Sequence, residues 1–195
     1  MAAKRTPETR VIAGDLKGRT LVYPRDRSLR PTMQRTKASV FDSLGDRVRG
    51  AVFVDLYAAA GGMGIEALSR GAGSVHFVEK DAGAIGCLEQ NLERCRAEPG
   101  RAVVHRAGVM EFLSSGALRG IDPDLIWADP PYGTDDTRLL LEFFSAVRYP
   151  LQALLLLEHR KDALPAEGPG GLVVLETRDF GQSRVTCFLL KGDAS

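Results

Sequence analysis

Four consecutive residues, Asp129-Pro130-Pro131-Tyr132, form the segment of the sequence best suited to chemistry. The two prolines fix φ and remove two backbone donors, so the segment is stiff and its carbonyls are available as acceptors. Asp129 and the Pro130 carbonyl can therefore accept both hydrogens of an amino group, while Tyr132 offers a ring on which a nucleobase can stack. An aromatic amine is a poor nucleophile because its lone pair is delocalised, and two well-placed acceptors favour a pyramidal, reactive nitrogen. The alternative is a rigid Pro-Pro turn capped by an aspartate.

Two earlier segments have the form of a nucleotide site. Residues 55–64 are mostly small and follow an apolar segment, and such a loop lets the backbone approach a ligand closely. Glu79 ends the next apolar segment, where an acid can accept both hydroxyls of a ribose. Each signal alone is weak, because glycine-rich turns and capping acids are common. The loop lacks a Walker-type lysine, which argues against phosphate transfer.

The surrounding pattern places these motifs at the ends of strands. We expect strands over residues 51–57, 74–79, 103–104, 125–128 and 153–158, alternating with helices over 64–70, 81–97, 110–113 and 138–147. Two further β-prone segments, 172–177 and 185–190, predict a closing hairpin. The pattern indicates an α/β, Rossmann-like fold with a mostly parallel seven-stranded sheet and a C-terminal antiparallel hairpin. Ligands of such sheets bind outside the carboxyl ends of the strands, where the three motifs lie.

The first fifty residues differ from the rest of the chain in charge. Residues 1–50 hold 12 Lys and Arg against 5 Asp and Glu, a net charge of +7, whereas residues 51–195 carry −6. The same segment predicts strands at 11–13 and 20–23 and a helix that ends near Gly45. We therefore divide the chain into a basic extension, 1–50, which binds nucleic acid, and a domain, 51–195. The alternative is a solvated polar N-terminus without a partner.

The composition argues against a membrane protein, a secreted disulfide-rich protein and a metal-binding protein. No run of 18 apolar residues occurs, which argues against a membrane span, and residues 1–10 lack the apolar stretch of a signal peptide. Three cysteines without a CxxC pair and three histidines far apart in sequence predict neither a disulfide framework nor a metal site. We therefore expect a cytoplasmic protein with reduced cysteines.

Residues 10–190 resemble the bacterial family of small-subunit ribosomal RNA guanine-N2 methyltransferases, within the class I methyltransferase fold. The resemblance rests on several segments: Arg10-Val11-Ile12-Ala13-Gly14, Gly18-Arg19, Leu29-Arg30-Pro31-Thr32 with Arg35, residues 55–71, Val78-Glu79-Lys80-Asp81, and Asp129-Pro130-Pro131-Tyr132. The last segment alone is shared with DNA adenine and protein glutamine methyltransferases, whereas the Arg-Pro-Thr segment and its spacing are more specific.

The resemblance implies S-adenosylmethionine as the cofactor and one guanine of 16S rRNA as the target, in a small ribosomal subunit or an assembly intermediate. We expect a monomer, and the resemblance assigns catalysis to residues 129–132. The implied cofactor-binding residues are Asp55, Tyr57, Ala59, Gly61, Gly64, Glu79, Lys80, Gly108 and Val109. The basic extension and the family motif together suggest these RNA contacts: Arg10, Arg19, Arg30, Thr32, Arg35 and Lys37.

Two alternatives remain open at this point. A DNA adenine-N6 methyltransferase would use the same Asp-Pro-Pro-Tyr segment, but the short chain leaves no room for a target-recognition domain. A non-catalytic RNA-binding module would explain the basic extension but leaves that segment without a purpose.

Several positions depart from the family pattern. Ala59 and Ala60 stand where Gly and Ser are usual, and Gly108 stands where an Asp commonly contacts the adenine ring. Gln34 and Ala38 replace acids that are common after Arg-Pro-Thr. None of these positions belongs to the catalytic segment, so we expect an active enzyme with altered cofactor affinity.

Overall fold

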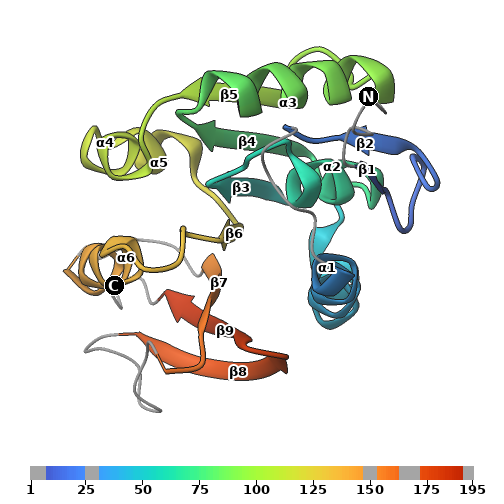
Figure 1. The fold of residues 1–195 in the computed structure, drawn as a ribbon. Coiled ribbons are helices and arrows are strands. Elements are labelled where there is room, and N and C mark those ends of the chain that lie inside the picture. Colours follow the sequence, from blue (N-terminus) through green and yellow to red (C-terminus); the bar gives the residue numbers. More distant parts are fainter. Residues whose placement is uncertain (1–7, 25–30, 147–152, 163–171, 191–195) are drawn as a thin grey trace, which may run out of the picture.

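The computed structural model describes residues 8–24, 31–146, 153–162 and 172–190. Its centre is a 7-stranded sheet in the order β5-β4-β3-β6-β7-β9-β8 (Figure 1). The strands are β3 (Val52–Leu56), β4 (Ser74–Glu79), β5 (Ala102–Arg106), β6 (Leu125–Ala128), β7 (Ala153–Arg160), β8 (Val173–Phe180) and β9 (Ser183–Leu190). The first five strands in this order, β5, β4, β3, β6 and β7, are parallel. β9 pairs antiparallel with both β7 and β8. The mostly parallel sheet and its closing hairpin are confirmed.

Helices cover both faces of this sheet (Figure 1). On one face lie α1 (Pro31–Leu44), the 3-10 helix η1 (Gly45–Val48), α2 (Gly62–Ser69) and α3 (Ala82–Cys95). On the other face lie α4 (Val109–Ser114), α5 (Ala117–Ile121) and α6 (Asp136–Ala146). Each face has its own apolar cluster, because successive side chains of a strand point to opposite sides. The sequence does not predict α5, whose five residues are too few to show a helical period.

The sequence explains where α3 begins and ends. Asp81 precedes the helix, and its carboxylate accepts a hydrogen bond of 2.7 Å from the Ala84 amide. Ile85 and Leu88 are buried, and Leu88 belongs to the apolar cluster on this face of the sheet. Arg96 then takes the left-handed conformation, with φ at 52°, and ends the helix earlier than predicted.

β1 (Glu8–Arg10) and β2 (Thr20–Val22) form the antiparallel hairpin expected in the extension. The prediction for the first strand, residues 11–13, is wrong by three residues. The amides of Ile12 and Ala13 donate to the Glu66 carboxylate, at 2.8 and 3.0 Å, instead of joining a strand ladder. A helix side chain takes the place of a strand partner there, and strand propensity cannot indicate such a partner.

The extension packs into the core that α2 and the sheet share. Val11, Leu21, Tyr23 and Phe41 are at most 4% exposed and belong to the same apolar cluster as Phe53 of β3. The change of charge at residue 50 therefore marks no break in the packing of the described residues. In the parts of the chain that the structure describes, no helix has the length and apolar character needed to span a membrane.

Candidate active site

A pocket lies at the carboxyl ends of β3 and β6, at the edge of the sheet where a ligand is expected. These strands are parallel neighbours with Asp55 opposite Trp127, so they end at the same edge. The lining residues come from the extension, the loop after β3 and the end of β6: Thr9, Tyr23, Gln34, Lys37, Asp55, Tyr57, Ala58, Ala59, Gly62, Met63, Trp127 and Asp129. The structure thus brings the predicted cofactor loop and the predicted catalytic segment together.

Asp55 holds the cofactor loop from inside. Its side chain is buried, and Oδ2 accepts a hydrogen bond of 2.8 Å from the Gly64 amide in the first turn of α2. Burial raises the pKa of Asp55 to about 8, against the effect of the Gly64 hydrogen bond, and the charge of Glu79 adds to the rise. Gly64 is required by packing, since a Cβ there would lie 2.2 Å from the Phe77 ring. Both residues therefore shape the loop through contacts within the protein.

The loop between β3 and α2 turns through left-handed backbone conformations. Tyr57, Ala59 and Gly61 have φ values of 59°, 48° and 81°. Residues with a side chain adopt this region at a cost, and glycine does not. The Ala59 amide donates to Glu79 Oε2 at 2.9 Å, which helps to hold the strained conformation. Ala59 therefore stands at a position where glycine would be unstrained.

Glu79 lies at the end of β4 and fixes the backbone around it. Its Oε1 accepts from the amides of Lys80 and Asp81, at 2.8 and 2.9 Å, and its Oε2 accepts from Ala59. A carboxylate has about four acceptor positions, so the Glu79 carboxylate retains capacity for a ribose hydroxyl. Lys80 contributes its backbone to this arrangement, and its side chain is exposed.

Gly108 immediately precedes α4 and Val109 is its first residue, and neither lines the pocket at β3 and β6. Gly108 has an ordinary φ of −64°, and the heavy atoms nearest to a Cβ built there lie 3.9 Å away, in Glu111. The structure therefore has room for a Cβ at position 108. Val109 is buried in the apolar cluster beneath α4.

The Asp129–Tyr132 segment leaves the end of β6 and carries its functional groups to the surface. Pro130 is buried, whereas Asp129, Pro131 and Tyr132 are exposed. The Tyr132 hydroxyl donates to Glu158 Oε1 of β7 at 3.3 Å. Partial burial raises the pKa of Tyr132, and the carboxylates of Glu158 and Asp129 raise it further. The phenol is thus protonated at neutral pH, and its ring is accessible beside Asp129.

A hydrogen bond joins the cofactor loop to the segment that follows the catalytic residues. The Tyr57 hydroxyl donates to Oδ1 of Asp136, the first residue of α6, at 2.9 Å. Burial raises the pKa of Tyr57, and Asp136 raises it further. Thr134 Oγ1 lies 2.5 Å from the other Asp136 oxygen and 2.9 Å from the Pro131 carbonyl. Tyr57 is therefore placed to fix the two loops relative to each other.

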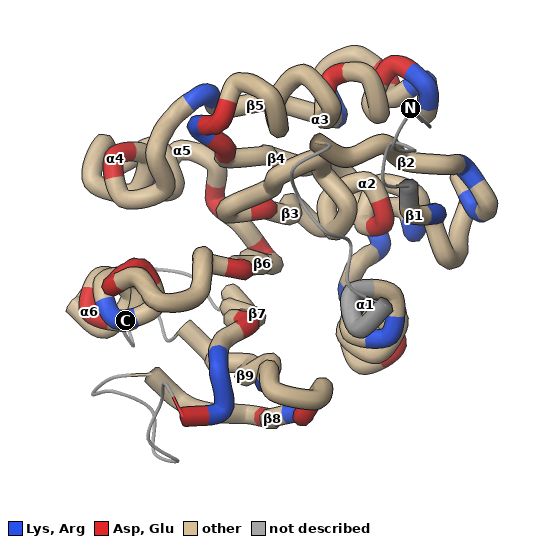
Figure 2. The backbone as a smooth tube through the Cα atoms, in the orientation of Figure 1, with Lys and Arg blue, Asp and Glu red and all other residues tan. Residues whose placement is uncertain are grey.

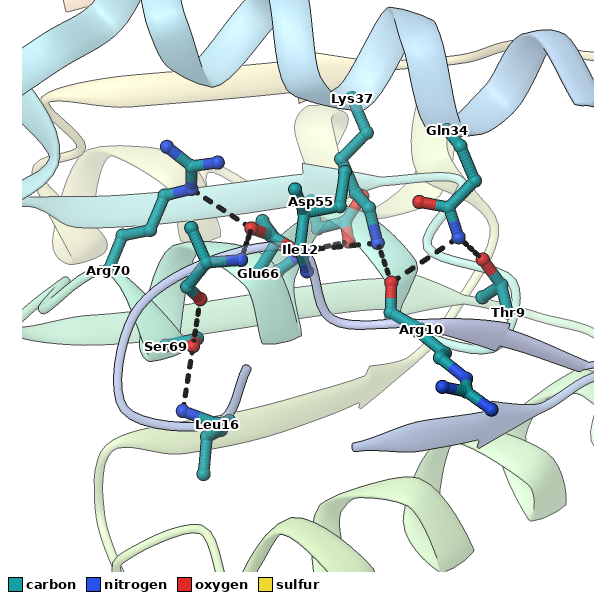
Figure 3. A network of polar contacts seen from close by, with 12 residues as sticks. Thr9, Arg10, Ile12, Leu16, Gln34, Lys37, Asp55, Glu66, Ser69 and Arg70 are labelled. Carbon is teal, nitrogen blue, oxygen red and sulfur yellow. Dashed lines mark hydrogen bonds and ion pairs between the residues drawn. The ribbon is translucent and has the colours of Figure 1, made fainter. Parts of the chain in front are cut away.

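Glu66 of α2 attaches the extension to the domain (Figure 3). Its fully buried carboxylate accepts two backbone amides of the extension and the Arg70 Nε, the last at 2.9 Å. Lys37 Nζ lies 3.4 Å from Glu66 Oε2 and donates to the Arg10 carbonyl at 3.0 Å. Burial lowers the pKa of Lys37, and Glu66 opposes that change. Lys37 is only 4% exposed, so its prediction as a surface RNA contact is wrong: it is a buried partner of Glu66.

Two further contacts hold the extension against the helices. The Ser69 carbonyl lies so close to Gly14 that a Cβ at Gly14 would sit 1.8 Å from it. Asn91 of α3 is fully buried and bonds both the amide and the carbonyl of Val22 at 2.9 Å. Asn91 also donates to the Ala60 carbonyl at 3.0 Å. This one side chain therefore connects β2 of the extension to the cofactor loop.

The other residues expected to contact RNA differ in accessibility. Arg10 and Arg35 are exposed, and so is Arg19, whose Nη1 donates to a carbonyl of α3 at 3.2 Å. Arg30 and the side chain of Thr32 lie outside the described residues. Figure 2 shows Lys and Arg around the β1–β2 hairpin and on α1, whereas Asp and Glu gather at the ends of β3, β4 and β6.

The sequence does not indicate that the extension helps to build the pocket. Thr9, Tyr23 and Gln34 line it together with Asp55. The Gln34 side-chain nitrogen bonds to Thr9 Oγ1, so these two residues support each other. The only signal in the sequence was that apolar and aromatic residues of the extension were spaced as in a folded segment. No local pattern places them beside the end of β3.

The strand order and the antiparallel position of β9 define the class I methyltransferase fold. A structure named "Putative methyltransferase yhhF" from Escherichia coli matches with a TM-score of 0.81 at 26% identity, over 96% of this chain and 100% of that chain.

Residues 9–189 match the family described as "Conserved hypothetical protein 95", and the chain belongs to this family. The chain is 32% identical over 184 residues to "Putative rRNA methyltransferase YlbH" of Bacillus subtilis, which covers 94% of this chain and 100% of that relative. It is 34% identical over 125 residues to "Ribosomal RNA small subunit methyltransferase D" of Escherichia coli, or 64% of this chain and 61% of that relative. The family suggested by the sequence motifs is thereby confirmed.

Proposed function

We propose that this protein transfers the methyl group of S-adenosylmethionine to the exocyclic N2 amine of a guanine in 16S rRNA. The observation that carries the proposal is the position of Asp129 in one pocket with the loop after β3, at the carboxyl edge of the sheet. Relatives named as rRNA methyltransferases support rRNA as the class of substrate. We further propose that the protein acts as a monomer on the small subunit or on an assembly intermediate.

The residues at the strand ends fit the cofactor. S-adenosylmethionine, when bound, supplies an electrophilic methyl group. The Glu79 carboxylate has the remaining acceptor capacity to bind a ribose hydroxyl, and the loop from Tyr57 to Gly62 borders the pocket that suits the methionine part. Gly108 and Val109, after β5, would border the adenine ring.

The catalytic segment has the groups that an aromatic amine requires. Asp129 and the Pro130 carbonyl accept the two N2 hydrogens, which favours a pyramidal nitrogen whose lone pair points out of the ring plane. The ring of Tyr132 stacks on the base and fixes its plane. The amine becomes strongly acidic when the new N–C bond forms, so it loses a proton without a dedicated histidine base. A guanine that is unpaired or extruded from a helix can reach this surface segment.

We assign the RNA backbone to the exposed arginines of the extension. Arg10, Arg19 and Arg35 are accessible, and Arg30 and Thr32 belong to the same proposed contact on the basis of the sequence. The domain is net acidic and would repel phosphates, so the extension supplies the attraction. Lys37 is left out because it is buried against Glu66.

A labelling assay tests the proposed function. The protein would be incubated with methyl-labelled S-adenosylmethionine and with small ribosomal subunits, free 16S rRNA, free 23S rRNA or duplex DNA. We expect label in 16S rRNA, as free RNA or within the subunit. Label in DNA adenine would instead identify a DNA methyltransferase. RNA binding without label in any substrate would identify a non-catalytic binding module.

A further inference from the structure

Glu158 occupies the place next to Asp129 on the neighbouring strand. Ala128 of β6 and Leu157 of β7 are paired in the parallel register, so Asp129 and Glu158 are the next residues on the two strands. Neighbouring strands are about 4.8 Å apart, and residues in register point to the same face. Trp127 and Leu156 belong to the apolar cluster on the pocket side, and alternation places Asp129 and Glu158 on that side as well.

Tyr132 shows independently that the two carboxylates are close. Its hydroxyl donates to Glu158 at 3.3 Å, and both Glu158 and Asp129 act on its ionisation. The proposed stacking ring thus lies close to both the group that binds the amine and a second carboxylate. A base stacked on this ring has Glu158 at its border.

The strand order places Glu158 on the side of Asp129 opposite the cofactor-binding strands. Along the sheet the order is β4, β3, β6, β7, so Glu79 and Asp55 of the cofactor half lie on one side of Asp129, and Glu158 lies on the other side. A guanine that presents N2 to Asp129 receives the methyl group from the β3 side. C2 of guanine lies between N1 and N3, and the orientation with N1 toward β7 places the N1 side of the Watson–Crick edge beside Glu158.

We propose that Glu158 accepts a hydrogen bond from N1–H of the target guanine and thereby selects guanine among purines. This inference rests on the proposed function. N1 of guanine carries a hydrogen, whereas N1 of adenine is an acceptor. An ionised carboxylate only accepts hydrogen bonds, so Glu158 binds the first and repels the second. Glu158 is therefore a specificity-determining residue, and Asp129 remains the residue that acts on the amine.

Purine analogues at the target position test this assignment. The methylated position would first be mapped by mass spectrometry, and 16S rRNA would then be ligated with guanine, 2,6-diaminopurine or 2-aminopurine at that position and assembled into subunits. All three bases carry the reactive amine at C2, but the two analogues lack N1–H. Because 2-aminopurine also lacks a group at C6, the pair separates the N1 effect from any contact at C6.

The wild-type enzyme should prefer guanine over both analogues by about 10- to 100-fold in kcat/KM, the effect of a hydrogen bond to a charged group. Glu158→Gln should reduce this preference to less than about threefold, because an amide can donate to the unprotonated N1. The matched control is Glu142→Gln, an exposed glutamate of α6 that pairs with Arg138, which should keep the full preference.

Two further measurements separate base selection from a structural role. S-adenosylmethionine affinity and the melting temperature of Glu158→Gln should equal those of the wild type. Tyr132→Phe removes the hydroxyl that Glu158 contacts, and it should lower activity without changing the ratio of guanine to analogue. If Glu158→Gln retains the full preference, or if Tyr132→Phe abolishes it equally, the inference is wrong. Failure of the wild type to methylate guanine would instead overturn the proposed function.

Discussion

The acidic residues around the candidate site fall into two groups that make different contacts. Asp55, Glu66 and Glu79 are at most 7% exposed, and each accepts backbone amides of nearby segments. Asp129 directly follows β6 and is exposed, and Glu158 lies beside it within β7 and contacts the Tyr132 hydroxyl. The first group holds backbone segments of the extension and of the cofactor half, and we propose that the second group contacts the substrate. Burial and contact with backbone amides therefore distinguish acids that residue type alone does not.

Removal of Glu66 should have the largest effect on stability. Glu66→Ala leaves the buried Lys37 without its ion-pair partner and leaves two amides of the extension unpaired. We expect the free energy of unfolding to fall by about 3–5 kcal/mol, the range for breaking a buried ion pair. Urea denaturation followed by circular dichroism would measure the loss.

The control for this prediction is Glu93→Ala, an exposed glutamate of α3. It should change stability by less than about 0.5 kcal/mol. A Glu66 variant as stable as the control would mean that this buried acid does not hold the backbone. The proposed difference between the two groups of acids would then be wrong.

Glu79 both accepts backbone amides and is the proposed partner of the cofactor ribose, so its removal should lower both stability and cofactor affinity. Glu79→Ala removes the acceptor of three amides and the proposed partner of the ribose. We expect S-adenosylmethionine to bind more weakly by about 1.5–3 kcal/mol, as for the loss of charge-assisted hydrogen bonds. Calorimetric titration would measure the affinity, alongside a denaturation curve. An unchanged dissociation constant with reduced stability would assign Glu79 to the backbone alone.

The strained backbone at Ala59 predicts a smaller effect, and here the substitution should increase stability. Ala59→Gly should relieve the left-handed conformation at φ 48° and stabilise the protein by about 0.5–1 kcal/mol. Ala58→Gly, one residue earlier and without a positive φ, should destabilise it instead. Thermal melts of the two variants would show the contrast. Equal effects of the two substitutions would mean that the loop conformation is not strained.

Cofactor affinity of Ala59→Gly would show whether that strain matters for binding. Tighter binding than in the wild type would mean that Ala59 crowds the loop. Weaker binding would mean that the loop has adapted to alanine.

The smallest expected effect concerns two histidines of the cofactor half. His76 Nδ1 and His105 Nε2 lie 3.0 Å apart on β4 and β5. Burial lowers the pKa of both side chains, and His105 lowers that of His76 further. The unfolded chain therefore takes up protons near pH 6.5 while the folded protein does not, so stability should fall as the pH drops below about 6.5. Denaturation curves between neutral and mildly acidic pH should show a shallower fall for His105→Gln, and parallel curves would refute the assignment.

Much of the fold could be predicted because its signals are local. The segments 74–79 and 125–128 match β4 and β6 residue for residue, since each is a short β-prone segment bounded by polar or turn residues. The first strand of the hairpin was misplaced because Glu66, more than fifty residues away in the sequence, takes its amides. Long-range side-chain to backbone bonds of this kind leave no trace in a local pattern.

The candidate site likewise has residues that the local sequence indicates and residues that only the packing reveals. Residues 129–132 could be singled out because two prolines between an acid and an aromatic ring are unusual, and the structure places them at the end of β6. The contribution of Thr9 and Gln34 to the pocket depends on how the extension packs, which charge and periodicity do not encode. Lys37 was misread for the same reason, because a lysine in a basic segment gives no sign of a buried partner.

Identification of the methylated nucleoside is the most direct test of the central claim. Small subunits or 16S rRNA would be treated with the wild type or with Asp129→Asn, digested to nucleosides and analysed by mass spectrometry, with cofactor affinity measured in parallel. We predict N2-methylguanosine with the wild type, a rate about 100- to 1000-fold lower with the variant, and similar S-adenosylmethionine binding by both proteins. A different methylated nucleoside, or undiminished N2-methylguanosine from Asp129→Asn, would contradict the account.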